Sequence, residues 1–150
     1  MLQNDLEGKR VIIALGGNAL GDTPSEQLKL LAHASKNLAH MVKEGINVVV
    51  THGNGPQVGI INKAFELAAA DKSSNMPHMP LSDCNAMSQS YIGSQLTCQL
   101  MSQFREQDIM RNVANVPTHV IVDPNDPAFQ DFEKPIGDFM TKEQAQAYAK

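Results

Sequence analysis

The sequence contains few of the residues that mark the more specialised classes of protein. Among its 150 residues there is no tryptophan, aromatic residues make up 5%, and there are two cysteines. A small disulfide-stapled secreted domain would contain more cysteines. A zinc site would need further ligands at a matching spacing, which the histidines do not supply. We therefore expect no metal held by this chain, and we expect Cys84 and Cys98 to be reduced, half-buried thiols on a helix.

Long apolar runs and a strong excess of one charge are also missing. No apolar run approaches the roughly 18 residues that a membrane helix needs, and the first nine residues lack the apolar segment of a secretory signal. A net charge of -4 argues against nucleic acid or a membrane surface as the main partner. With 42% hydrophobic and 19% charged residues, the sequence is typical of an ordinary globular domain, and a cytoplasmic location is expected.

Apolar runs alternate with amphipathic segments in an order that predicts an α/β protein. Short runs rich in β-branched residues predict parallel strands buried on both faces, at 11–15, 46–50 and 118–122. Helical periodicity and capping signals predict helices from Pro24 to Gly45, from Pro56, over 82–107 and from Thr141. This order favours a largely parallel sheet with right-handed crossovers.

Two glycine-rich turns directly follow the first two predicted strands. The first consists of Gly16, Gly17 and Asn18, and the second of Gly53, Asn54 and Gly55. In an open parallel sheet, ligands bind beyond the carboxyl ends of the strands. Glycine lets backbone N–H groups approach a ligand closely, and a helix that starts nearby attracts anions. The pattern predicts a pocket for a small anion and a phosphoryl group in transfer, although each turn could also be only a tight strand-to-helix connection.

Two familiar phosphate-binding motifs do not fit. The GxxxxGK[ST] loop is absent. Gly53, Gly55 and Gly59 approach a dinucleotide fingerprint, but the third glycine is one place late and no acidic residue follows at the next strand end.

Two cationic or titratable residues near the predicted turns are candidates for a role. Lys134 lies between Phe132 and Ile136 in a segment that Pro135 stiffens. It is either a solvated surface charge or a cation held over the pocket. His52 immediately precedes the second glycine turn, and we expect it to orient that turn by hydrogen bonding rather than to act as an acid or base.

Five segments, in order, resemble carbamate kinases, which belong to the amino acid kinase superfamily. They are VIIALGGNAL at 11–20, THGNGPQVG at 51–59, AMSQSYIG at 86–93, DPAF at 126–129 and KPIG at 134–137. The second segment is quite specific, because superfamily members that phosphorylate other acids carry different forms of both glycine turns.

The resemblance implies a three-layer α/β/α sandwich with a largely parallel sheet, and a homodimer. It implies reversible phosphoryl transfer from ATP to carbamate, giving ADP and carbamoyl phosphate, with Mg²⁺ in the complete enzyme; the reverse direction makes ATP in arginine metabolism. By motif matching, Gly16, Gly17 and Asn18 would line the transfer site. Gly53, Asn54 and Gly55 would hold the carbamate. Lys134, on a small protruding subdomain at about 124–140, would offset negative charge.

The family also carries a second half, with the nucleotide pocket, that these residues do not match. We therefore expect residues 1–150 to be the amino-terminal, carbamate-binding half, inactive alone. The sequence departs from the family at two positions. Ser90 stands where glycine is usual, and Met140, after Phe139, stands where tyrosine or phenylalanine is common. The segment around Ser90 is expected to serve packing or dimer contacts. Two alternatives stay open: a non-catalytic anion-binding half-domain, and a kinase of another small carboxylate.

Overall fold

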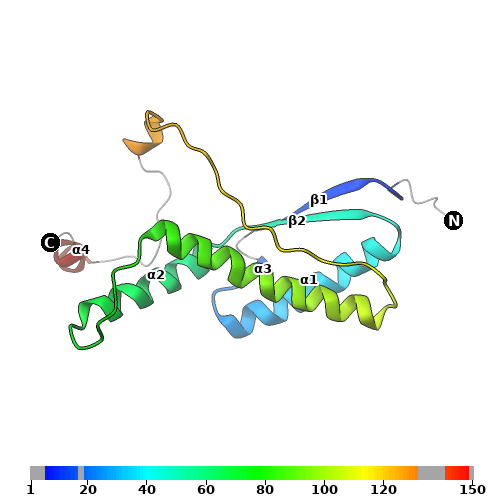
Figure 1. Cartoon of the computed structure of the whole chain (residues 1–150), viewed down its shortest axis with the longest axis horizontal. Helices are drawn as coiled ribbons and strands as arrows, with labels where there is room; N and C mark the ends of the chain where they lie inside the picture. The colour runs from blue at the N-terminus through cyan, green and yellow to red at the C-terminus, as the bar shows by residue number, and fades with distance from the viewer. Residues whose placement is uncertain (1–5, 17–18, 132–140, 149–150) are drawn as a thin grey trace.

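The protein is described here by a computed structural model that covers residues 6–16, 19–131 and 141–148 (Figure 1). Its elements, in chain order, are β1 (Arg10–Leu15), α1 (Pro24–Lys43), β2 (Asn47–His52), α2 (Gly55–Ala70), α3 (Leu81–Glu106), the 3-10 turn η2 (Pro127–Phe129) and α4 (Lys142–Tyr148). The predicted helices are confirmed to within a few residues at each end. Thr23 caps α1 by accepting a hydrogen bond from the Glu26 N–H, and Gly45 follows its end with φ +83.

The sheet of the described residues consists of β1 and β2. These strands pair in parallel, from Arg10 opposite Asn47 to Leu15 opposite His52. Burial alternates along both strands, and Ile12 is 68% exposed. The prediction that both faces are buried is therefore wrong for this chain. The physical reason is that α1 and α3 cover only one face, and no described element packs on the other.

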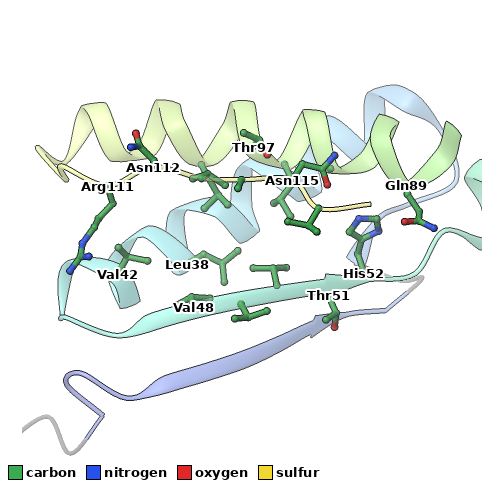
Figure 2. A pocket seen from close by; sticks show the side chains of 18 of the residues that line it. Leu38, Val42, Val48, Thr51, His52, Gln89, Thr97, Arg111, Asn112 and Asn115 are labelled. Atoms are coloured by element: carbon green, nitrogen blue, oxygen red, sulfur yellow. The ribbon is translucent and has the colours of Figure 1, made fainter. Parts of the chain in front are cut away.

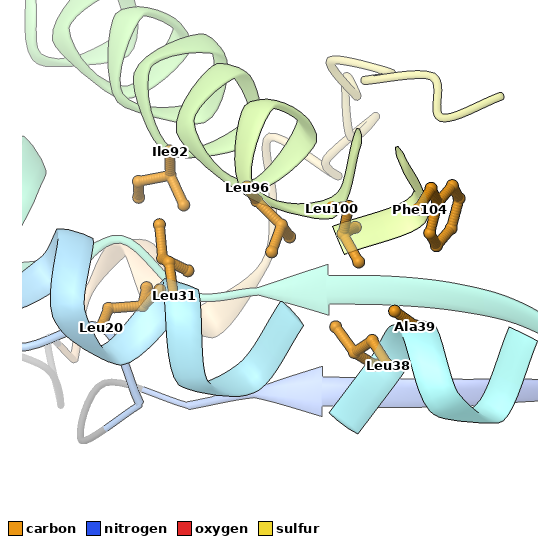
Figure 3. Packing of buried hydrophobic residues seen from close by; sticks show 8 residues of the cluster. All are labelled: Leu20, Leu31, Leu38, Ala39, Ile92, Leu96, Leu100 and Phe104. Atoms are coloured by element: carbon orange, nitrogen blue, oxygen red, sulfur yellow. The ribbon is translucent and has the colours of Figure 1, made fainter. Parts of the chain in front are cut away.

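The hydrophobic core lies between that covered face and the two helices (Figure 3). Its buried members are Leu20 from the loop before α1, Leu31, Leu38 and Ala39 from α1, and Ile92, Leu96, Leu100 and Phe104 from α3. Four half-buried strand residues pack against this cluster: Ile13, Leu15, Val48 and Val50. The core thus packs α1 and α3 against the parallel strand pair. This packing holds the strand ends in place.

The predicted third strand at 118–122 is not formed. Val120 is 81% exposed and Ile121 is fully exposed, and the backbone of this segment pairs with neither β1 nor β2. The stretch is anchored instead by Gln89 of α3, whose side chain exchanges two hydrogen bonds with the Thr118 backbone, at 2.8 and 3.2 Å. The β-branched residues favour an extended backbone, but a strand also needs a neighbour that accepts its ladder bonds.

The two cysteines lie on α3 as predicted, but they are not both half-buried. Cys84 is fully buried and Cys98 is exposed, and both are free thiols. Burial raises the pKa of the Cys84 thiol, and the charge of Asp83 adds to this effect. None of the helices in the described ranges is long and apolar enough to cross a membrane.

A pair of leucines on α1 tests the core assignment. Leu31 is fully buried, whereas Leu28, one turn away on the same helix, is 43% exposed. We expect Leu31→Ala to lower the free energy of unfolding by about 2–5 kcal/mol, because it leaves a cavity. The matched control Leu28→Ala should change it by less than about 1 kcal/mol. Urea denaturation measures both, and equal losses would contradict the assignment of this core.

Candidate functional site

Parallel pairing brings the two glycine turns to the same edge of the sheet. The last register pair joins Leu15 and His52, so each turn starts one residue later on adjacent strands. The Gly53 N–H donates a hydrogen bond of 3.0 Å to the Leu15 carbonyl. Because that donor is already used, Gly53 contributes space to the site rather than a hydrogen bond.

Three of the predicted site glycines are not required by the fold. A Cβ placed on Gly16, Gly53 or Gly55 would meet nothing within 4 Å, and none of the three has a positive φ. Neither packing among the described residues nor backbone conformation therefore explains glycine at these positions. Close approach of a ligand does explain it, and this favours the binding interpretation over a mere tight connection.

Three other predicted site residues are outside the described ranges. Gly17 and Asn18 belong to 17–18, and Lys134 belongs to 132–140. Their assignments to the transfer site and to charge compensation stay predictions.

The start of α2 lies at the second turn, and its capping side chain is turned away. Asn54 occupies the N-cap position but makes no side-chain cap bond. Its amide nitrogen donates instead to Asn85 Oδ1, at 2.5 Å, and to Ser88 Oγ, at 2.6 Å. His52 Nδ1 lies 3.0 Å from the Gly53 carbonyl, as expected for a residue that orients the turn. Substrate contacts at this turn would therefore come from backbone groups.

A chain of hydrogen-bonded carboxamides, two of them buried, links the segments that follow the two turns. Gln57 Nε2 donates to the Gly21 carbonyl, at 3.1 Å, and to Gln27 Oε1, at 2.7 Å. Gln27 Nε2 then donates to Gln95 Oε1, at 2.6 Å. Gln27 and Gln57 are 1% and 4% exposed. This chain joins the loop after the first turn to α1, α2 and α3, and so fixes the spacing of the two turns.

These supporting residues were missed from the sequence. Gln27 shares a helix face with the buried Leu31, and Gln57 is buried next to Val58 at the start of α2. Ser88 lies in the segment 86–93, for which packing or dimer contacts are expected, and Asn85 directly precedes it. A polar residue at an apolar helical position was the available signal, but spacing alone does not say which partner it meets.

The described residues also form a groove of about 810 Å³ beside β2 (Figure 2). Val48 and Leu38 line its middle, and the extended segment from Arg111 to Thr118 runs along its far side. Only one end, at His52 and Asn54, reaches the second glycine turn. The groove follows the edge of β2 with which no described strand pairs. The candidate anion site is therefore the turn itself and not the groove as a whole.

The parallel strand pair with glycine turns at its carboxyl edge is typical of α/β proteins that bind a ligand at that edge, and comparison with known proteins gives the family. The model of the amino acid kinase family matches residues 9–124. The chain therefore belongs to the amino acid kinase family.

Within that family the similar proteins include carbamate kinases and a carbamate kinase-like protein. The chain is 46% identical, over 142 residues, to the carbamate kinase-like protein YqeA of Escherichia coli K12, covering 95% of this chain and 46% of that protein. It is 45% identical to carbamate kinase 3 of Staphylococcus aureus USA300, covering 94% and 45%. A solved carbamate kinase from Giardia lamblia bound to AMP-PNP superposes with a TM-score of 0.75 at 38% identity, covering 94% and 45%. The chain spans about half the length of these relatives.

The carboxamide chain can be tested by removing its central member. We expect Gln27→Ala to destabilise the protein by about 1–3 kcal/mol, because it leaves the buried Gln57 amide without one partner. Lys29→Ala, at an exposed position of the same helix, is the control and should be nearly neutral. Thermal and urea unfolding give the difference. If the two variants are equally stable, the carboxamides do not fix the turns.

Proposed function

We propose that the two glycine turns form the carbamate and phosphoryl end of a carbamate kinase site. The observation that carries this proposal is the trio of unobstructed glycines at the carboxyl ends of two paired parallel strands. The names of the relatives support carbamate as the substrate. In this proposal, the chain is the carbamate-binding half of the enzyme, and 124–140 is its small subdomain.

The chemistry asks little of protein side chains beyond position and charge. A carbamate oxygen is already an anionic nucleophile, and it attacks the γ-phosphorus of ATP. The bond to the ADP oxygen breaks, ADP leaves, and carbamoyl phosphate forms, so no protein base is needed. Positioning and electrostatic stabilisation supply the catalysis. Gly16, Gly17 and Asn18 would line the path of the phosphoryl group, and Lys134 would offset its charge.

The nucleotide side of the reaction is a poor fit to the residues present. The part of the chain that the structure describes has no group of three side chains able to hold a metal ion, and the sequence has no GxxxxGK[ST] loop. AMP-PNP, an ATP analogue, is bound by the Giardia lamblia relative, which is about twice as long. We propose that ATP and Mg²⁺ are held by the half that the relatives have in addition.

A homodimer and a role in arginine metabolism are proposed on the family resemblance. A cytoplasmic location, with no nucleic-acid or membrane partner, is proposed from the composition and the net charge of -4. A second candidate function is a non-catalytic anion-binding half-domain, because unobstructed glycines at the two turns would admit an anion without any transfer. A kinase of another small carboxylate differs from the main proposal only in its acceptor, so a panel of acceptors separates the two.

The reaction can be assayed as ATP formation from carbamoyl phosphate and ADP. We expect none from the 150-residue chain alone, and turnover when the chain is continued by the second half of a carbamate kinase. Phosphate binding without turnover in the continued protein would favour the non-catalytic candidate.

In that continued protein, Lys134→Ala should lower kcat by roughly 100- to 1,000-fold, because one charge-stabilising group is lost at the transferring phosphoryl. The melting temperature should be nearly unchanged. Lys142→Ala, an exposed lysine at the start of α4, is the matched control and should retain full activity. Full activity in the Lys134 variant would make Lys134 a surface lysine.

A further inference from the structure

We propose that α3 keeps the anion site open by holding Asn54 away from the start of α2. Asn85 and Ser88 are then positioning residues for substrate binding, although neither touches substrate. The identity of the ligand in this inference rests on the function proposed above, whereas the capping argument stands on the geometry alone.

Asn54 would ordinarily cap α2. Asparagine is among the strongest N-cap residues, and its side-chain oxygen normally accepts from the N–H of the second or third helical residue. In α2 the second residue is Pro56, which has no N–H. The Gln57 N–H is therefore the one conventional target, yet Asn54 makes no cap bond.

Two acceptors on α3 account for this. Asn85 Oδ1 and Ser88 Oγ both accept from the Asn54 amide. Ser88 is fully buried, and its hydroxyl donates to the Asn85 carbonyl at 2.6 Å, which leaves its oxygen free to accept. Both amide hydrogens of Asn54 are thereby directed toward α3, and the side chain is anchored there.

The consequence is an uncapped helix terminus beside an open glycine. With Asn54 held aside, no group within the described residues accepts a hydrogen bond from the N–H of Gly55 or Gln57. The space above Gly55 is unobstructed, and the positive end of the α2 dipole lies at the same point. These two N–H groups can meet the anionic oxygens of a carbamate or phosphate.

The test is the double variant Asn85→Ala with Ser88→Ala in the 150-residue chain. Released from α3, Asn54 should cap α2, so hydrogen exchange of the Gln57 N–H, measured by NMR, should slow roughly fivefold. An anion must then displace the cap, so inorganic phosphate should bind about fivefold more weakly. Adding Asn54→Gly, which removes the competing side chain, should restore phosphate binding. Ser90→Ala, an exposed serine on α3, is the control and should change neither quantity.

The outcomes separate this inference from the proposed function. A merely structural role for Asn85 and Ser88 would speed exchange and weaken binding together, without rescue by Asn54→Gly, and would overturn the inference. Unchanged exchange would overturn it as well. Absence of phosphate binding in the unmodified chain would reject the proposed function, while the exchange rates still decide the capping argument. If circular dichroism shows the double variant to be unfolded, the same measurements are made on the single variant Asn85→Ala, whose position is exposed.

Discussion

The in-register parallel pairing of β1 and β2 is the constraint on which the rest of the structure depends. It makes two turns that are far apart in the sequence begin at the same edge, one residue beyond Leu15 and His52. The hydrogen bond from Gly53 to Leu15 extends this pairing into the second turn. The core that clamps α1 and α3 onto one face holds the strands in that register. Without this register the two turns would not meet at one edge of the sheet, and each would be only the start of a helix.

Next to the turns, hydrogen bonds between polar side chains fix relative positions that apolar packing alone would leave open. Buried amides are costly unless their hydrogen-bonding groups are paired, and pairing them requires specific geometry. Gln27 and Gln57 therefore determine where the helices can sit relative to the loop at Gly21. Ser88 fixes Asn54 in the same way. The site is consequently shaped by side chains from three helices, and these side chains need not contact a substrate.

The sequence allowed much of this to be predicted, and the failures have physical causes. The strands at 11–15 and 46–50, the helices, and the positions of Gly16 and Gly53 directly after the strands follow from local signals that act within a few residues. Residues 118–122 carry the same local signal but form no strand, because pairing depends on a neighbour that the local pattern does not reveal. The exposure of Ile12 has the same kind of cause, because burial of that face also depends on a neighbouring element that the local pattern does not reveal. The role of Ser88 could not be predicted, since its partner Asn54 is distant in the sequence.

The central claim is that the two glycine turns together form one anion site, and shift mapping by NMR tests it most directly. The probe is phosphonoacetamide, a stable analogue of carbamoyl phosphate in which a methylene group replaces the bridging oxygen. The account predicts saturable shifts of the backbone amides of Gly16, Gly55 and Gln57 with one common dissociation constant. Shifts centred on the groove residues Val48 and Leu96, or separate constants for the two turns, would contradict it.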